Sequence, residues 1–217
     1  MKKSKKPAYT LAEELINSIS HGTGALAAAG GMAVLIVFSA LQGDVWKVVS
    51  SSIYGATMIM LYTFSALYHS FTDGKVKSVF RIFDHCSIFL LIAGSYTPFT
   101  LVTLREATPA IGWTLFGVVW GAAIIGIVLN IVSLEKFKVF SMICYIAMGW
   151  AVVFAIKPLI ANLAKGGIIL LASGGLAYTV GIIFYAIRKK YMHSIWHFFV
   201  LGGTILQYFA VLFYVVL

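Results

Sequence analysis

The chain has 217 residues, of which 61% are hydrophobic and only 11% are charged, and its mean hydropathy is +0.96. A water-soluble domain of this length carries more charge, so the composition indicates that lipid surrounds most of the chain. The formal charge of +9 does not indicate nucleic acid, because the basic residues are spread over several short segments. Anionic membrane lipids are the expected counter-charge and the expected partners.

Apolar runs of about 20 residues recur along the sequence, and a helix of that length crosses a hydrocarbon core of roughly 30 Å. Strands of a barrel would need only about 10 residues of alternating polarity. The sequence therefore predicts an all-α fold, a single domain over residues 1–217 that forms a polytopic bundle of seven transmembrane helices. The predicted spans are 21–41, 48–68, 80–101, 111–132, 139–156, 168–187 and 195–217.

Residues 1–20 are predicted to be a cytoplasmic segment that contains a short amphipathic helix. Thr10 and Glu13 have the spacing of a capping box, which marks the start of that helix. Glu14, Asn17 and His21 follow at spacing i, i+3, i+7 and therefore share one face. This face either supports a polar site in the membrane or is simply solvated at the interface.

The basic residues near the ends of the spans predict the orientation, because such residues are retained in the cytoplasm. One alternating set of loops carries twelve of them and the other set carries four. The N-terminus is therefore predicted to be cytoplasmic and the C-terminus extracytoplasmic. The larger set is Lys2, Lys3, Lys5, Lys6, Lys75, Lys77, Arg81, Lys136, Lys138, Arg188, Lys189 and Lys190; the smaller is Lys47, Arg105, Lys157 and Lys165.

All five histidines lie at the predicted cytoplasmic ends of spans. His193 and His197 are spaced i, i+4, which places two imidazoles on one helix face, as a metal site requires. The other three are His21, His69 and His85.

Ser65 and His69 repeat the i, i+4 spacing at the inner end of the second predicted span, and Asp84 follows at the inner start of the third. A carboxylate in an apolar helix is costly to bury without a partner, and a divalent cation held by imidazoles is a suitable one. Two local alternatives remain open: Ser65 bonds back to its own helix, and Asp84 pairs with Arg81. His85 points about 100° away from Asp84 and is assigned a supporting role.

These residues closely resemble those of the hemolysin III proteins, the bacterial branch of the progestin and adiponectin receptor family. The resemblance covers nearly the whole chain. A wider superfamily that includes the alkaline ceramidases has a similar pattern of one Ser, one Asp and three His. The matching segments here are 14–21 (ELINSISH), 65–69 (SALYH), 83–85 (FDH), 93–99 (AGSYTPF) and 193–197 (HSIWH).

The resemblance implies a zinc ion bound by His69, His193 and His197, with Asp84 near the bound water and Ser65 beside it. It also implies a bacterial plasma membrane protein with a cytoplasmic N-terminus. Glu14, Asn17, His21 and His85 are then expected to support the site or to lie at the interface.

Four functions are compatible with the sequence. The first is a zinc-dependent hydrolase of a lipid amide or ester, in which Asp84 accepts a proton and Ser65 donates to the developing oxyanion. The second is a receptor-like regulator of membrane lipids with structural zinc, and the third is a lytic protein. Proton or ion transport is the fourth and the least favoured, because the ionisable groups gather near one side of the membrane.

Overall fold

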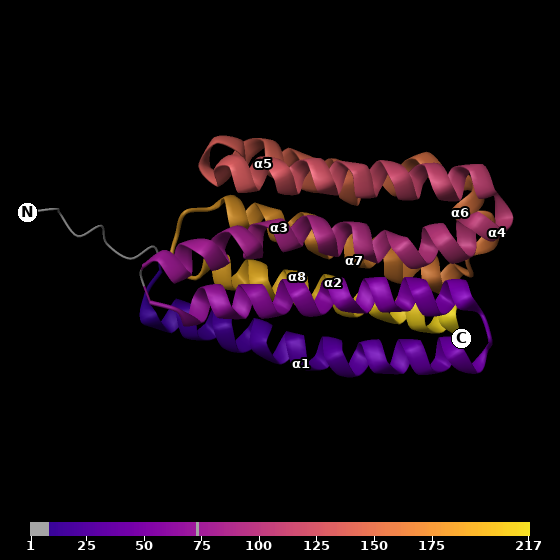
Figure 1. The fold of residues 1–217 in the computed structure, drawn as a ribbon, viewed down its shortest axis with the longest axis horizontal. Helices are drawn as coiled ribbons and strands as arrows, with labels where there is room; N and C mark the ends of the chain where they lie inside the picture. Colours follow the sequence, from indigo (N-terminus) through magenta and orange to yellow (C-terminus); the bar gives the residue numbers. More distant parts are fainter. Residues whose placement is uncertain (1–8, 73) are drawn as a thin grey trace, which may run out of the picture.

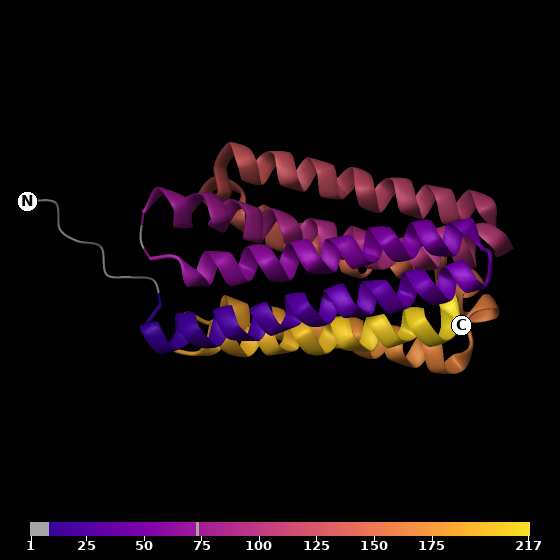
Figure 2. The ribbon, with the colours of Figure 1, turned by 60° about the horizontal axis from the view of Figure 1, so that its bottom comes forward.

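The computed structural model describes residues 9–72 and 74–217, which form one elongated helical bundle without β-strands (Figures 1 and 2). α1 begins at one end of the bundle and the C-terminus lies at the other (Figure 1). The elements are α1 Leu11–Leu41, α2 Val45–Ser70, α3 Lys75–Pro98, the π-helix η1 Phe99–Leu104, α4 Arg105–Ala107, α5 Pro109–Gly149, the 3-10 helix η2 Ala151–Ala155, α6 Ile156–Asn162, α7 Lys165–Ala186, α8 Met192–Val211 and the π-helix η3 Leu212–Val216.

Six helical segments among the described residues are long and apolar enough to cross a membrane. The prediction of an all-α polytopic fold is thus confirmed for this part of the chain. Large apolar side chains face outward along these segments, with Leu26 77% exposed and Phe154 90% exposed. Such a surface suits lipid rather than water. The six segments are Leu11–Leu41, Val45–Ser70, Lys75–Ala107, Pro109–Asn162, Lys165–Ala186 and Met192–Val216.

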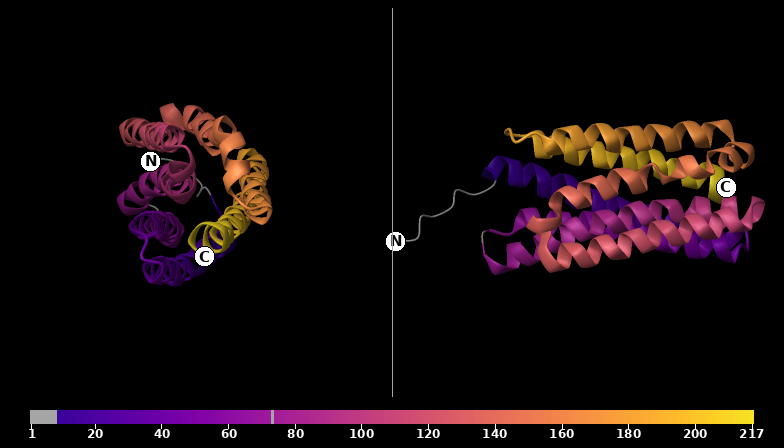
Figure 3. Two further views of the ribbon diagram at one scale, coloured as in Figure 1. Left: turned by 90° about the vertical axis from the view of Figure 1, so that its right-hand side faces the viewer. Right: turned by 90° about the horizontal axis from the view of Figure 1, so that it is seen from above.

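The fourth segment contains two of the seven predicted spans, 111–132 and 139–156. It is interrupted at Ser133, whose φ of −166° and ψ of 99° are extended rather than helical. Ser141 donates a hydrogen bond of 2.7 Å to the Asn130 side-chain oxygen, eleven residues away. A continuous helix rises about 16 Å over eleven residues, so the chain must reverse here. α5 is accordingly a helical hairpin, which is visible in the right panel of Figure 3.

The amphipathic helix and the first span were predicted as successive segments, but they form the uninterrupted helix α1. It begins with the predicted capping box: Glu13 N donates to Thr10 Oγ1 at 3.4 Å, and Thr10 N donates to Glu13 Oε2 at 2.9 Å. Because α1 packs against α2 and α8, Asn17 and His21 are buried instead of solvated.

Close approach and interhelical hydrogen bonds fix the order of the helices around the bundle axis (Figure 3, left). At Gly126 in α5, a Cβ atom would come within 2.2 Å of the Phe89 ring of α3, so only glycine allows this approach. Tyr62 of α2 donates to Thr204 of α8 at 2.7 Å, and the Tyr178 hydroxyl of α7 lies 2.8 Å from the same oxygen. These contacts hold α2, α7 and α8 together around Thr204.

Candidate metal centre

Three imidazoles from two helices converge at the end of the bundle where α1 begins. His193 Nε2 lies 3.3 Å from His69 Nε2 and 3.2 Å from His197 Nε2. Two nitrogens bound to one tetrahedral zinc at 2.0–2.1 Å are roughly 3.3–3.4 Å apart, so this spacing fits that ion. The donor set could hold a metal ion, and its members are buried or half-buried.

The sequence places these imidazoles through simple helix geometry. His193 and His197 are one turn apart at the start of α8, and His69 lies at the end of α2. No fourth His, Cys, Asp or Glu of the described residues joins the group, so these residues leave the fourth position of a tetrahedral ion free. Three imidazoles with a free position are typical of catalytic rather than structural zinc sites.

A carboxylate from α1 orients the His69 ring. Glu14 Oε2 lies 2.6 Å from His69 Nδ1, and its other oxygen accepts from Lys77 Nζ at 2.7 Å. Asn17 Nδ2 lies 3.5 Å from the same imidazole nitrogen. A proton on His69 Nδ1, donated to Glu14, leaves the Nε2 lone pair directed at the other two histidines.

The neighbouring carboxylate, Glu13, reaches a different helix. Its Oε1 accepts a hydrogen bond of 2.8 Å from the backbone N–H of Tyr191, whose φ of 63° lies in the left-handed region. This contact holds the turn that precedes α8 and so positions His193. From the sequence Glu13 is expected only in the capping box, because no local pattern indicates this partner 178 residues away.

Aromatic rings close the site from two sides. Tyr9 packs over His193, with ring centroids 4.8 Å apart, and over His69 at 5.5 Å. Burial raises the pKa of the Tyr9 phenol, so the hydroxyl remains protonated and can donate a hydrogen bond. On the opposite side His21 stacks on His197 at 3.7 Å with an interplanar angle of 17°. Tyr9 was not among the predicted residues, because a single aromatic residue before a helix carries no metal-site signal.

Asp84 and His85 are neighbours on α3, and neither belongs to the group of three imidazoles. Asp84 is buried, and its Oδ2 lies 3.5 Å from His85 Nδ1, but it is not among the ligand atoms that converge. His85 is turned away and its Nδ1 bonds the Arg81 carbonyl at 2.9 Å. The alternative pairing of Asp84 with Arg81 is wrong, because Arg81 instead binds Glu135 at 2.5 Å.

Ser65 lies one helical turn deeper than His69 on the same face of α2 and is fully buried. Among the described residues its hydroxyl has no hydrogen-bond partner, so it does not bond back to its own helix as the alternative proposed. An unpaired buried hydroxyl is unfavourable and indicates a group that is available to a ligand.

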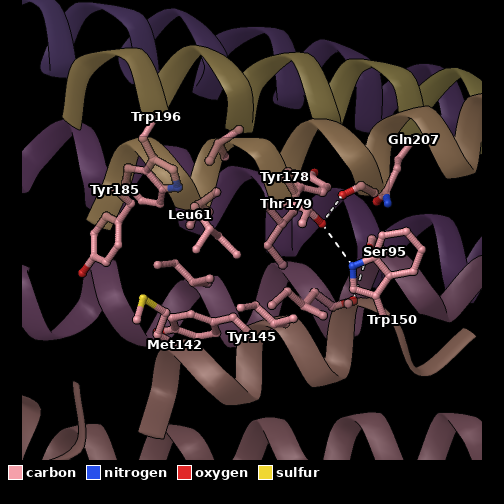
Figure 4. Close-up of a pocket in the computed structure, with 18 of the residues that line it drawn as sticks. Leu61, Ser95, Met142, Tyr145, Trp150, Tyr178, Thr179, Tyr185, Trp196 and Gln207 are labelled. Carbon is pink, nitrogen blue, oxygen red and sulfur yellow. Dashed lines mark hydrogen bonds between the residues drawn. The ribbon is translucent and has the colours of Figure 1, made fainter. Parts of the chain in front are cut away.

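A largely apolar cavity lies among the helices, and Asp84 and His21 are among the residues that line it. Figure 4 shows many of its other lining residues. Its walls come from α1, α2, α3, the part of α5 that follows Ser133, α7 and α8. Trp150 Nε1 donates to Thr179 Oγ1 at 3.1 Å and joins α7 to the end of the α5 arm (Figure 4). Gln207 lies at the far end of the cavity, so a polar group is available there as well.

Comparison with known proteins identifies the family of the chain. The family model described as haemolysin-III related matches residues 9–208. The chain is 46% identical to "Hemolysin-3" of Bacillus cereus over 94% of this chain and 92% of that protein, and 44% identical to the "Hemolysin-3 homolog" of Bacillus subtilis over 96% and 97%. A human "Monocyte to macrophage differentiation factor" is 28% identical over 93% and 84%.

No solved structure matches the chain. The family match spans almost all of the described residues, including α2 and α8, which supply the three histidines. The helices long enough to cross a membrane lie within the same region or extend just beyond it. The chain therefore belongs to the haemolysin-III-related family and is a multi-pass protein of the cell membrane.

Proposed function

We propose that this protein is a zinc-dependent hydrolase that cleaves an amide or ester bond of a membrane lipid. The observation that carries the proposal is the set of three imidazoles, His69, His193 and His197. His21, which stacks on His197, lines an apolar cavity together with the buried Asp84. A zinc ion bound by the three imidazoles supplies Lewis acidity, which polarises a carbonyl oxygen and acidifies water.

The residues around the donor set have complementary roles in this proposal. Asp84 accepts a proton as water adds to the acyl carbonyl carbon and returns it to the departing amine or alcohol. Ser65, whose hydroxyl is unpaired among the described residues, donates to the carbonyl oxygen as negative charge develops there. Glu14 keeps the His69 ring in the orientation that binding requires.

The shape of the cavity supports a lipid substrate. It extends from Asp84 to Ser95 along α3, which is about 16 Å of helix, or roughly half the thickness of the hydrocarbon core. Apolar side chains such as Leu61, Ile88 and Val200 line it. An acyl chain can therefore lie in the cavity while its polar linkage stays beside the histidines.

We also propose that the chain crosses the membrane seven times, with its N-terminus in the cytoplasm. The reversal at Ser133 supports two crossings within Pro109–Asn162, in addition to those of the other five segments. The surplus of basic residues at the histidine end supports the cytoplasmic orientation. The proposed site then lies at the inner face of the membrane.

Metal analysis and lipid turnover together test the function. Purified protein should carry about one zinc per chain, and His193→Ala should lose it, as measured by emission spectroscopy. Asp84→Asn should keep most of the zinc but lose about 100-fold to 10,000-fold in hydrolysis of ceramide-like or acyl-ester lipids, since an amide cannot accept the proton. If Asp84→Asn loses both its zinc and its fold, the result would instead indicate that Asp84 binds the zinc directly.

Failure of the wild-type protein to cleave any amide or ester lipid would refute the hydrolase and favour a regulator with structural zinc. Direct lysis of other cells, which the names of the relatives suggest, receives no support from the geometry. A protein that inserts from water must first hide its apolar faces, and here they are exposed on all the long helices.

A further inference from the structure

A second cavity of about 980 Å³ opens at the histidine end of the bundle and has a different character from the apolar one. We call it the basic vestibule. Its walls come from the N-terminal turn of α1, the start of α3, the bend of α5 and the connection between α7 and α8. The basic residues that line it are Lys77, Arg81, Lys138, Arg188, Lys189 and Lys190.

Two of these six cations are already neutralised. Lys77 binds Glu14 at 2.7 Å, and Arg81 binds Glu135 at 2.5 Å. Glu13 is the single carboxylate on the described walls, and its oxygens accept from Thr10 and from the backbone of Tyr191.

The other four basic residues have no carboxylate partner within 4.0 Å in the part of the chain that the structure describes. They gather in one cavity, which distinguishes them from basic residues that merely flank a span. Lys75, at the start of α3, and Lys136, near the bend of α5, do not line the cavity. The four are Lys138, Arg188, Lys189 and Lys190.

The vestibule adjoins the histidines. Tyr9 and His193 form part of its wall, and their rings are in contact. Tyr185 lines both the vestibule and the apolar cavity, and Figure 4 shows its hydroxyl directed away from the apolar side chains. One molecule could therefore extend from the vestibule, past the histidines, into the apolar cavity.

We propose that the basic vestibule binds a phosphate group, carried by the headgroup of an anionic lipid whose acyl chain occupies the apolar cavity. A phosphate offers several strong acceptor oxygens and up to two negative charges, which matches converging Lys and Arg donors better than a single carboxylate does. That this lipid is a substrate rests on the proposed hydrolase. That the vestibule binds its phosphate does not depend on hydrolysis.

Binding of short-chain lipids to the purified, metal-loaded protein in neutral detergent micelles tests the inference, with native mass spectrometry as the readout. Dioctanoyl phosphatidic acid should bind more tightly than dioctanoylglycerol, which has the same chains and no phosphate. The double variant Lys138→Gln with Arg188→Gln should weaken phosphatidic acid about 25-fold, at roughly fivefold for each cation removed. Its affinity for dioctanoylglycerol should not change.

The matched control is Lys75→Gln with Lys136→Gln, which removes the same charge from residues that do not line the vestibule. It should bind phosphatidic acid within about threefold of the wild type. Equal weakening by the two double variants, or equal binding of the two lipids, would overturn the vestibule as a phosphate site. Competition by inorganic phosphate at the same concentration as the lipid would support the site and assign it to a soluble phosphate ester.

The readout needs no turnover, so a failure of binding is distinguishable from a failure of the hydrolase. Cleavage of neutral lipids without binding of phosphatidic acid would support the proposed hydrolase and refute the phosphate site.

Discussion

Replacing Glu14 is the most direct test of how the three imidazoles are held. The carboxylate and the His69 ring are 2.6 Å apart, and their side chains are 16% and 0% exposed, so the bond is nearly shielded from water. Glu14→Ala removes the acceptor that orients the ring and favours a proton on Nδ1. Loss of such a partner lowers metal affinity about 10-fold to 100-fold, which corresponds to roughly 1.4–2.7 kcal/mol.

Competition for zinc with a chromophoric chelator measures this affinity in detergent. Glu14→Gln should fall between wild type and Glu14→Ala, because its amide oxygen still accepts from His69 but carries no charge. Two controls separate the effect from general changes in charge. Glu135→Gln breaks the ion pair with Arg81, and Lys77→Met breaks the ion pair with Glu14; both leave the Glu14–His69 bond in place.

Both controls should hold zinc within about threefold of wild type. The Arg81–Glu135 pair is exposed and contributes little by itself, and Lys77→Met leaves the carboxylate that orients His69 in place. Unchanged zinc affinity in Glu14→Ala would show that this carboxylate does not support the ligand. An equal loss in Glu135→Gln would trace the effect to the net charge at this end of the bundle.

Two further predictions concern the fold and its orientation. Gly126→Ala should lower the free energy of unfolding by about 1–3 kcal/mol, because the added methyl group meets the Phe89 ring; Gly121→Ala, which meets nothing within 4 Å, should be nearly neutral in the same unfolding assay. Reporter fusions should be active outside the cytoplasm after Leu217 and inside it after Lys190, and the opposite result at either position would contradict the proposed seven crossings or their direction.

The three histidines could be predicted from the sequence because their placement depends on local helix geometry. The i, i+4 spacing brings His193 and His197 to one face, and the hydropathy pattern assigns His69 the same depth. The partners of these residues could not be predicted in the same way. Glu13 and Glu14 are adjacent on α1, yet they bind groups 178 and 55 residues away. The packing of α1 against α2 and α8 brings Glu13 to Tyr191 and Glu14 to His69.

Long-range packing also decides two features that local rules leave open. Arg81 has Asp84 three residues away, but Asp84 faces the interior of the bundle, so the distant Glu135 is the partner. The reversal at Ser133 contains neither glycine nor proline, and the helical hydrogen bonding resumes almost immediately. Hydropathy locates such a break between two apolar runs, but the sharpness of the bend comes from the contacts between the arms, such as Asn130 with Ser141.

The separation of the ligands along the chain has a consequence for biosynthesis. His69 and His193 are 124 residues apart, so at roughly 5–20 residues per second their synthesis is separated by about 6–25 s. During that interval α2 is already available for insertion, while its histidine has neither of the partners from α8. Metal can therefore be captured by all three imidazoles only after the last long helix has entered the membrane and docked against the first two. Under the proposed function, metal loading is thus a late event in maturation, and a chain whose synthesis ends before α8 lacks the complete donor set.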